Sequence, residues 1–269
     1  MESSPATGTD PALKAVYHRL ADGRWEEKER AIAQEFPLTV FVNGQEYVTL
    51  LCTPQKLNYL ILGRLYLEGL IQGVGDVANI SVCSDEPVAQ VRLLDQSVAL
   101  PMPRVIFSGC GSAPAPVGKA NALRPLESSL MVTAEELVSL MDELLKSAYL
   151  HRSYGGLHIS GMADSQQILV VAEDIGRHNT LDKIQGECLY RGLSTKDRII
   201  LTTGRLSSEM VEKAARMGAP VVASRNSPTD RAVALADSLG ITLVGYVRGP
   251  HMSVYTHAQG ANAGNDLTF

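Results

Sequence analysis

The pattern of apolar and polar positions divides the chain into two halves. In the first half, short segments rich in β-branched and aromatic residues predominate, and two of them, 38–42 and 45–51, flank the pair Asn43-Gly44. Both residues of an Asn-Gly pair tolerate positive φ, so this pair is typical of a tight turn between antiparallel strands. The sequence therefore predicts a β-hairpin here, and two further short strands over 77–82 and 88–94.

Two other features complete the first half. A helix is predicted to begin at Pro54 with Thr53 as its N-cap, because leucine and isoleucine then recur at helical spacing over 57–65. Residues 1–33 are polar and carry a run of charges, which predicts a flexible N-terminal arm. Residues 34–126 are therefore predicted to form a small α+β domain.

The second half alternates strands with helices. Thr133 and Glu136 form a capping box, which predicts a helix that runs to about Tyr149. Continuous apolar strands that alternate with helices are typical of a mostly parallel sheet covered on both faces, so residues 127–269 are predicted as an α/β domain. The predicted strands are 168–172, 198–203, 221–223 and 241–247, and the predicted helices are 179–191, 207–217 and 229–239.

Composition and charge narrow the class of protein. The 269 residues are 45% hydrophobic and 20% charged, which is typical of a globular chain. The net charge of −5 disfavours a nucleic-acid partner, and no apolar run reaches the roughly 18 residues that a membrane span needs. The start of the sequence does not resemble a secretory signal, and the cysteines are scattered, so we expect reduced thiols and a cytoplasmic protein.

Arginines follow the predicted strands of the second half. Arg177, Arg205, Arg225 and Arg248 each lie in the loop after one of these strands. In open α/β sheets ligands bind outside the carboxyl ends of the strands, where free helix amides and guanidinium groups suit phosphate. A single Gly-Arg pair at a strand end is ordinarily a turn with a solvated charge. Four such loops favour an anionic ligand, of which a phosphate-bearing nucleotide is the simplest.

Cys110 is the candidate reactive residue among the four cysteines. It lies between glycines in the segment Ser108–Pro114, where the thiol is unshielded, as a nucleophile or sulfur carrier requires. Cys52, Cys83 and Cys188 are instead expected to be buried, inert thiols. No two cysteines have the spacing of a zinc ribbon, and no metal site is predicted.

Two long blocks resemble a known family. Residues 173–183 (EDIGRHNTLDK) and 203–214 (TGRLSSEMVEKA) are similar to motifs of the formate dehydrogenase accessory sulfurtransferases, the FdhD proteins. The resemblance extends over about residues 34–260. It implies a carrier that accepts persulfide sulfur from a cysteine desulfurase and passes it to the molybdenum of bis(molybdopterin guanine dinucleotide), for the activity of formate dehydrogenase. It also implies a cytidine-deaminase-like fold for the second half without the deaminase zinc, a homodimer, and guanine nucleotide as a related ligand.

The resemblance also assigns residues. It makes Cys110 the persulfide cysteine, but Ala113 replaces the second cysteine of the family's loop, so Cys110 would act alone. The family's cofactor-binding stretch near the carboxyl end matches residues 246–251, with His251 in place of an arginine. The residues predicted to contact the anionic cofactor are Gly176, Arg177, His178, Asn179, Gly204, Arg205, Ser207, Arg225, Tyr246, Val247, Arg248, Gly249, Pro250 and His251.

Two other functions remain open from the sequence. One is a non-catalytic chaperone that binds the molybdenum cofactor and hands it to formate dehydrogenase, with Cys110 incidental. The other is a nucleotide hydrolase on the α/β scaffold, for which Asp174 and Glu209 are the available carboxylates.

Overall fold

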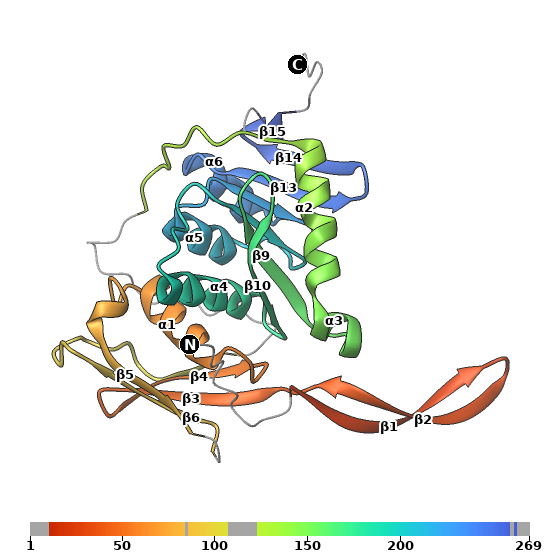
Figure 1. The fold of residues 1–269 in the computed structure, drawn as a ribbon, viewed down its shortest axis with the longest axis horizontal. Coiled ribbons are helices and arrows are strands. Elements are labelled where there is room, and N and C mark those ends of the chain that lie inside the picture. Colours follow the sequence, from red (N-terminus) through yellow and green to blue (C-terminus); the bar gives the residue numbers. More distant parts are fainter. Residues whose placement is uncertain (1–10, 84–85, 107–122, 259–260, 263–269) are drawn as a thin grey trace.

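The computed structural model describes residues 11–83, 86–106, 123–258 and 261–262. The chain forms an arm and two sheets, each sheet with its own helices (Figure 1). The loop that contains Cys110 lies outside the described residues, as do residues 1–10 of the predicted arm.

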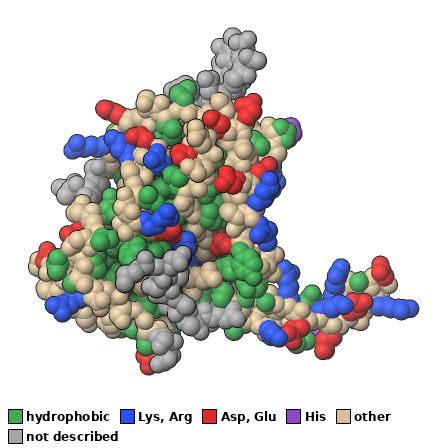
Figure 2. All heavy atoms as spheres, in the orientation of Figure 1, with side chains coloured by type: hydrophobic (Ala, Val, Ile, Leu, Met, Phe, Trp, Pro, Cys, Tyr) green, Lys and Arg blue, Asp and Glu red, His purple; other side chains and the backbone are tan. Residues whose placement is uncertain are grey.

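The arm is a β-hairpin and not the flexible segment that the sequence predicts. Strands β1 (Ala12–Ala21) and β2 (Arg24–Ala33) pair antiparallel over ten residues each, and Asp22 and Gly23 turn with positive φ. The hairpin extends away from the rest of the molecule, and both acidic and basic side chains line it (Figures 1 and 2). The charges hid its strand pattern, because apolar residues such as Trp25 do not alternate with them in one regular order.

A five-stranded sheet with one helix forms the first half. Asn43 and Gly44 make the predicted turn, both with positive φ, and the two predicted strands that follow the helix are confirmed. The apolar face of this sheet packs on α1. In the order β5-β6-β3-β4-β7, the strands are β5 (Val77–Val82), β6 (Val88–Leu93), β3 (Phe36–Val42), β4 (Gln45–Cys52) and β7 (Arg104–Ile106), and the helices are α1 (Leu57–Leu67) and the short 3-10 turn η1 (Val74–Asp76).

Helix α1 begins three residues later than predicted. Its N-cap is Lys56, in the left-handed region with φ of 54°, and no side chain caps it. Thr53 is buried and engaged elsewhere, because its N–H donates to Asp174 and its hydroxyl accepts from the N–H of Ile175. A contact more than a hundred residues away in sequence therefore overrides the local capping preference.

The second sheet has six strands in the order β10-β9-β11-β12-β13-β14. It is mixed rather than mostly parallel, because only the pairs β11–β12 and β12–β13 are parallel. Short connections join β9 to β10 and β13 to β14, and a short connection permits only antiparallel pairing. The strands are β9 (His158–Ala163), β10 (Ile168–Asp174), β11 (Ile199–Thr202), β12 (Val221–Ser224), β13 (Thr242–Arg248) and β14 (His251–Thr256).

Helices cover both faces of this sheet, as predicted. Helix α2 lies on one face, and α4, α5 and α6 lie on the other (Figure 1). The capping box of Thr133 and Glu136 opens α2, which ends at Ser147, and a separate short helix follows. The helices are α2 (Ala134–Ser147), α3 (Tyr149–Tyr154), α4 (Arg177–Arg191), α5 (Ser208–Met217) and α6 (Asp230–Ser238), and two short strands, β8 (Val132–Thr133) and β15 (Ala261–Asn262), pair nearby.

The two halves meet where α1 crosses α4. Gly63 and Gly186 lie at this crossing, and a Cβ atom at Gly63 would overlap the carbonyl oxygen of Asp182, while one at Gly186 would overlap that of Tyr59. The two helix backbones are therefore in direct contact. Leu126, at the end of the predicted first domain, already packs against the core beneath α5 and α6, so the chain joins the second core before residue 127.

Candidate functional site

Four loops with arginines lie at one edge of the six-stranded sheet. Strands β11, β12 and β13 run parallel, and β10 has the same direction because β10 and β11 both pair antiparallel with β9. The carboxyl ends of all four strands therefore meet at this edge, which we call the carboxyl edge. The prediction that the four arginine loops lie at one edge is therefore confirmed although the sheet is mixed. Only β9 and β14 run in the opposite direction, and none of the four loops follows either strand.

Hydrogen bonds join neighbouring loops of the carboxyl edge. The hydroxyl of Ser224 donates to the carbonyl of Gly204 at 2.6 Å, and the N–H of Arg225 donates to the carbonyl of Thr202 at 3.1 Å. The Nε of Arg248 donates to the carbonyl of Arg225 at 3.1 Å. The loops after β11, β12 and β13 are thus one connected structure, so the predicted residues Gly204, Arg225 and Arg248 do come together.

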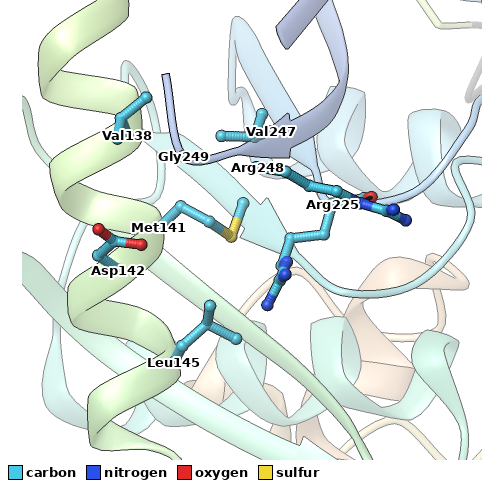
Figure 3. A pocket seen from close by; sticks show the side chains of 8 residues that line it. All are labelled: Val138, Met141, Asp142, Leu145, Arg225, Val247, Arg248 and Gly249. Carbon is cyan, nitrogen blue, oxygen red and sulfur yellow. Dashed lines mark hydrogen bonds between the residues drawn. The ribbon is translucent and has the colours of Figure 1, made fainter. Parts of the chain in front are cut away.

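A pocket opens between this edge and helix α2. Arg225 and Arg248 come from the edge, and Met141 and Leu145 form an apolar wall on α2 (Figure 3). The pocket opens to solvent, and its volume of about 240 Å³ includes part of that open space. It combines two guanidinium groups with an apolar surface, which is the arrangement that a ligand with a flat ring and phosphates requires. Its lining residues are Val138, Met141, Asp142, Leu145, Arg225, Val247, Arg248 and Gly249.

The stretch 246–251 is a hairpin and not an open loop. Val247 is buried in the core between the sheet and α2, while Tyr246 and Gly249 have positive φ. Gly249 and Pro250 form the turn, and His251 begins β14 as an exposed residue. Of the six predicted residues, Arg248 is the cation that reaches the pocket, and His251 lies beyond the turn.

On the α4 side of the carboxyl edge, the predicted residues 176–179 are all buried. Gly176 is the N-cap of α4, and no side chain caps the helix. Arg177 lies beneath Gly204, where a Cβ atom would come within 2.8 Å of the Cβ of Arg177, so the close approach requires glycine. Asn179 uses both hydrogens of its amide within the chain, donating to Asp174 and to the carbonyl of Leu51. Both donor hydrogens of Asn179 are therefore occupied within the chain.

His178 pairs with the first turn of α5. Its Nε2 lies 3.2 Å from Oε2 of Glu209 and 3.4 Å from the hydroxyl of Ser207, the N-cap of α5. Burial, and then the nearby cations Lys213 and Arg177, lower the pKa of His178 to about 2. Burial also raises the pKa of Glu209. The imidazole is consequently neutral, and its Nε2–H donates to the Glu209 carboxylate.

A buried chain of hydroxyl groups supports the loops from below. Thr180 donates to the carbonyl of Arg177 at 2.6 Å, and its oxygen lies 2.6 Å from the hydroxyl of Ser160. Ser160 donates in turn to Thr202, which accepts the N–H of Gly204 at 3.1 Å. The sequence did not reveal this chain, because Ser160 lies in β9, a strand that the sequence did not predict, and Thr202 lies in a strand predicted only from its apolar residues. The three hydroxyl groups come from three separate elements, α4, β9 and β11.

The remaining candidates lie as follows. Arg205 is exposed beside the N-terminus of α5. Cys52 and Cys188 are buried as predicted, and burial raises the pKa of both thiols, that of Cys188 to about 12. Cys83 is exposed, which corrects the prediction that it is buried, because β5 ends one residue before it. Cys110 lies outside the described residues, so its prediction is untested.

The carboxylates proposed for a hydrolase do not form a metal site. Asp174 is fully buried and accepts hydrogen bonds from Gly176, Asn179 and Thr53. Glu209 pairs with His178. Among the described residues, no group of three or more histidine, cysteine or carboxylate side chains could hold a metal ion, and no helix is long and apolar enough to cross a membrane.

The fold and the site define a class: a two-sheet α/β protein with a cationic carboxyl edge. Comparison with known proteins narrows this class. The chain belongs to the FdhD/NarQ family, whose model matches residues 33–262.

Individual relatives agree with this assignment. "Sulfur carrier protein FdhD" of Bacillus pumilus is 36% identical over 91% of this chain and 96% of its own length. The protein of the same name from Geobacillus kaustophilus is 38% identical over 89% and 93%. A crystal structure of a candidate formate dehydrogenase accessory protein from Desulfotalea psychrophila superposes with a TM-score of 0.77 at 26% identity, covering 94% of this chain and all of that one.

Proposed function

We propose that this protein is a sulfurtransferase of formate dehydrogenase maturation. It receives persulfide sulfur from a cysteine desulfurase on Cys110 and passes it to the molybdenum of bis(molybdopterin guanine dinucleotide), which is its substrate. The family and the names of its relatives support the sulfur-carrier role. The observation that supports the anionic substrate is the carboxyl edge, where four loops with arginines meet in a protein of net charge −5.

The first chemical step is redox-neutral. The Cys110 thiolate attacks the outer sulfur of the desulfurase persulfide, a new S–S bond forms on Cys110, and the desulfurase cysteine leaves as a thiolate. In the second step the S–S bond on Cys110 breaks, and its electron pair returns to the Cys110 thiolate. The outer sulfur becomes sulfide by taking two electrons from a reduced molybdenum centre. One cysteine is sufficient for both steps, which is consistent with Ala113 in place of a second cysteine.

The residues of the carboxyl edge would hold the substrate. Arg225 and Arg248 face the pocket beside α2, and Arg205 lies near the amides at the start of α5, so phosphates can bind at either end. Val138, Met141 and Leu145 offer an apolar surface for a ring of the substrate. The protein thus supplies binding and orientation, while the reactivity belongs to the molybdenum.

Other parts of the proposal follow from the family resemblance. We propose a homodimer in the cytoplasm, with a cytidine-deaminase-like fold in the second half and guanine nucleotide as a ligand of the same edge. The alternative function is a chaperone that carries the molybdenum cofactor without sulfur chemistry. The carboxyl edge fits both functions, so Cys110 is the residue that separates them.

The experiment is intact-protein mass spectrometry after incubation with a cysteine desulfurase and cysteine. The native chain should gain one sulfur atom that a reductant removes, and Cys110→Ala should gain none. Cys83→Ala is the matched control, because Cys83 is an exposed thiol that is not in the loop. A gain that survives in Cys110→Ala, or no gain in the native chain, would leave the chaperone as the function of this protein.

A further inference from the structure

Glu209 places a carboxylate at the carboxyl edge, where a binding site for anions would be expected to contain no negative side chain. It lies on the first turn of α5, at the carboxyl edge, and its side chain is 23% exposed. Arg177, Lys213 and Arg64 act on it as cations, yet burial raises its pKa. Electrostatic repulsion from this carboxylate weakens the binding of a bare phosphate nearby.

The pairing with His178 leaves Glu209 with capacity to bind. Oε2 accepts from His178, and Oε1 makes no hydrogen bond to any residue that the structure describes. A carboxylate has about four lone-pair positions on its two oxygens, so Glu209 can accept further donors on both. The imidazole also orients the carboxylate, because burial and the nearby Lys213 lower the pKa of His178 and keep it neutral, so that its Nε2–H can only donate.

The surrounding groups make Glu209 distinct from the other carboxylates nearby. Asp182 accepts from Lys213 and faces Arg64, and Glu68 pairs with Arg64 and Arg104, so both are already neutralised. Among the residues that the structure describes, Glu209 makes its ion-pair contact with the neutral His178, while Lys213, Arg177 and Arg64 act on it without such a contact. The charged and titratable groups that act on the pair come from four elements: Arg64 on α1, His158 on β9, Arg177 on α4, and Glu212 and Lys213 on α5. Asp182 on α4 and Glu68, the C-cap of α1, act on Lys213.

We propose that Glu209 is a specificity-determining residue that reads a 2-amino-4-oxopyrimidine edge on the ligand. This edge carries a ring N–H beside an exocyclic NH₂, and two parallel donors match the two oxygens of a carboxylate. Guanine and pterins share it. The inference rests on the proposed function, since it assumes that a phosphate-bearing ligand occupies the carboxyl edge.

Calorimetric titration of the full chain with five probes tests the assignment. GDP is compared with IDP, which lacks the amino group, and pterin is compared with lumazine, in which an oxygen replaces it. Pyrophosphate reports on the phosphate contacts alone. The variant is Glu209→Gln, and Glu212→Gln on the same helix is the matched control.

Glu209→Gln is expected to change affinity in opposite directions for the amino-bearing ligands and for pyrophosphate. The native chain should prefer the amino-bearing member of at least one pair by about tenfold or more, because a hydrogen bond to a charged group is lost in the other member. Glu209→Gln should abolish that preference and bind pyrophosphate more tightly, and Glu212→Gln should do neither. A purely structural role would weaken all probes alike.

The outcomes separate the ligand sources and the two proposals. A preference in the GDP pair assigns guanine to Glu209, and one in the pterin pair assigns the pterin. Binding of GDP and pyrophosphate with a preference that Glu209→Gln leaves unchanged overturns this inference alone. Absence of all binding overturns it together with the anionic edge of the proposed function.

Discussion

The ammonium group of Lys183 lies 2.7 Å from Oδ2 of Asp174, and both side chains are almost completely buried. Hydrogen bonds from this pair join the second half of the chain to Thr53 in the first half. Lys183 donates to the carbonyl of Thr53 at 3.1 Å, and Asp174 accepts the N–H of Thr53 at 3.0 Å. Since Asp174 also accepts the N–H of Gly176, one buried carboxylate joins the domain junction to the start of the carboxyl edge.

The first prediction concerns this pair. Asp174→Asn leaves the charge of Lys183 buried without its partner, so we expect the free energy of unfolding to fall by about 3–5 kcal/mol. Urea denaturation followed by circular dichroism measures it. Lys14→Met, which breaks an exposed pair with Glu29 on the arm, is the control and should leave the free energy of unfolding nearly unchanged. Equal losses in the two variants would show that the buried pair does not hold the junction.

The crossing of α1 and α4 gives the second prediction. Gly186→Ala would push a methyl group into the backbone of Tyr59, so we expect a loss of about 3 kcal/mol in the free energy of unfolding. Gly75→Ala is the control, because a Cβ atom there meets nothing within 4 Å. The same urea titration compares them, and a Gly186→Ala chain as stable as the native one would contradict the close packing.

His178 predicts a pH dependence of stability. Its pKa is about 2 in the folded chain, against an ordinary value of about 6.5 in the unfolded chain. Below pH 6.5 the unfolded state therefore binds a proton that the folded state does not, and stability decreases as the pH falls. From pH 7.5 to pH 5 the contribution of His178 should be a loss of about 2 kcal/mol.

Two variants isolate this contribution. His178→Gln should flatten the decline of unfolding free energy between pH 7.5 and pH 5 by about that 2 kcal/mol. His18→Gln, on the exposed arm, should follow the native curve. If the native and His178→Gln curves stay parallel through this range, the assignment of His178 as a buried, neutral imidazole is wrong.

The arginines of the pocket predict salt-sensitive binding. Arg225→Ala and Arg248→Ala should each weaken the affinity for GDP by about tenfold in calorimetric titration, because each removes a charge-assisted hydrogen bond to phosphate. Arg216→Ala, in the last turn of α5 and so far from the edge, should leave the affinity unchanged. The native affinity should decrease with added salt. Equal effects of Arg225→Ala and Arg216→Ala would place the nucleotide elsewhere.

Local sequence patterns predicted the elements whose causes are local. The Asn43-Gly44 turn and the capping box of Thr133 each depend on residues within a few positions, and both form as expected. The four arginine loops were also predictable, because the apolar strands before them are continuous and the direction of a strand fixes which end carries its loop.

The features that the sequence did not predict depend on distant partners. Strand β9 contains Ser160 and Gly161, which weaken a strand pattern, but Gly161 allows a close approach by Leu144 and Ser160 joins the buried hydroxyl chain. Thr53 is a good N-cap by type, and only the fold shows that Asp174 engages it. The same holds for Glu209, whose neutral partner His178 comes from another helix.

Formate dehydrogenase activity in a host that lacks its own protein of this family tests the central claim most directly. The native chain should restore the activity, and Cys83→Ala should restore it equally. Cys110→Ala should restore none while it keeps its affinity for GDP, because the carboxyl edge is intact and only the sulfur-carrying thiol is gone. Full activity with Cys110→Ala would contradict the account, and the protein would then be a carrier of the molybdenum cofactor rather than of sulfur.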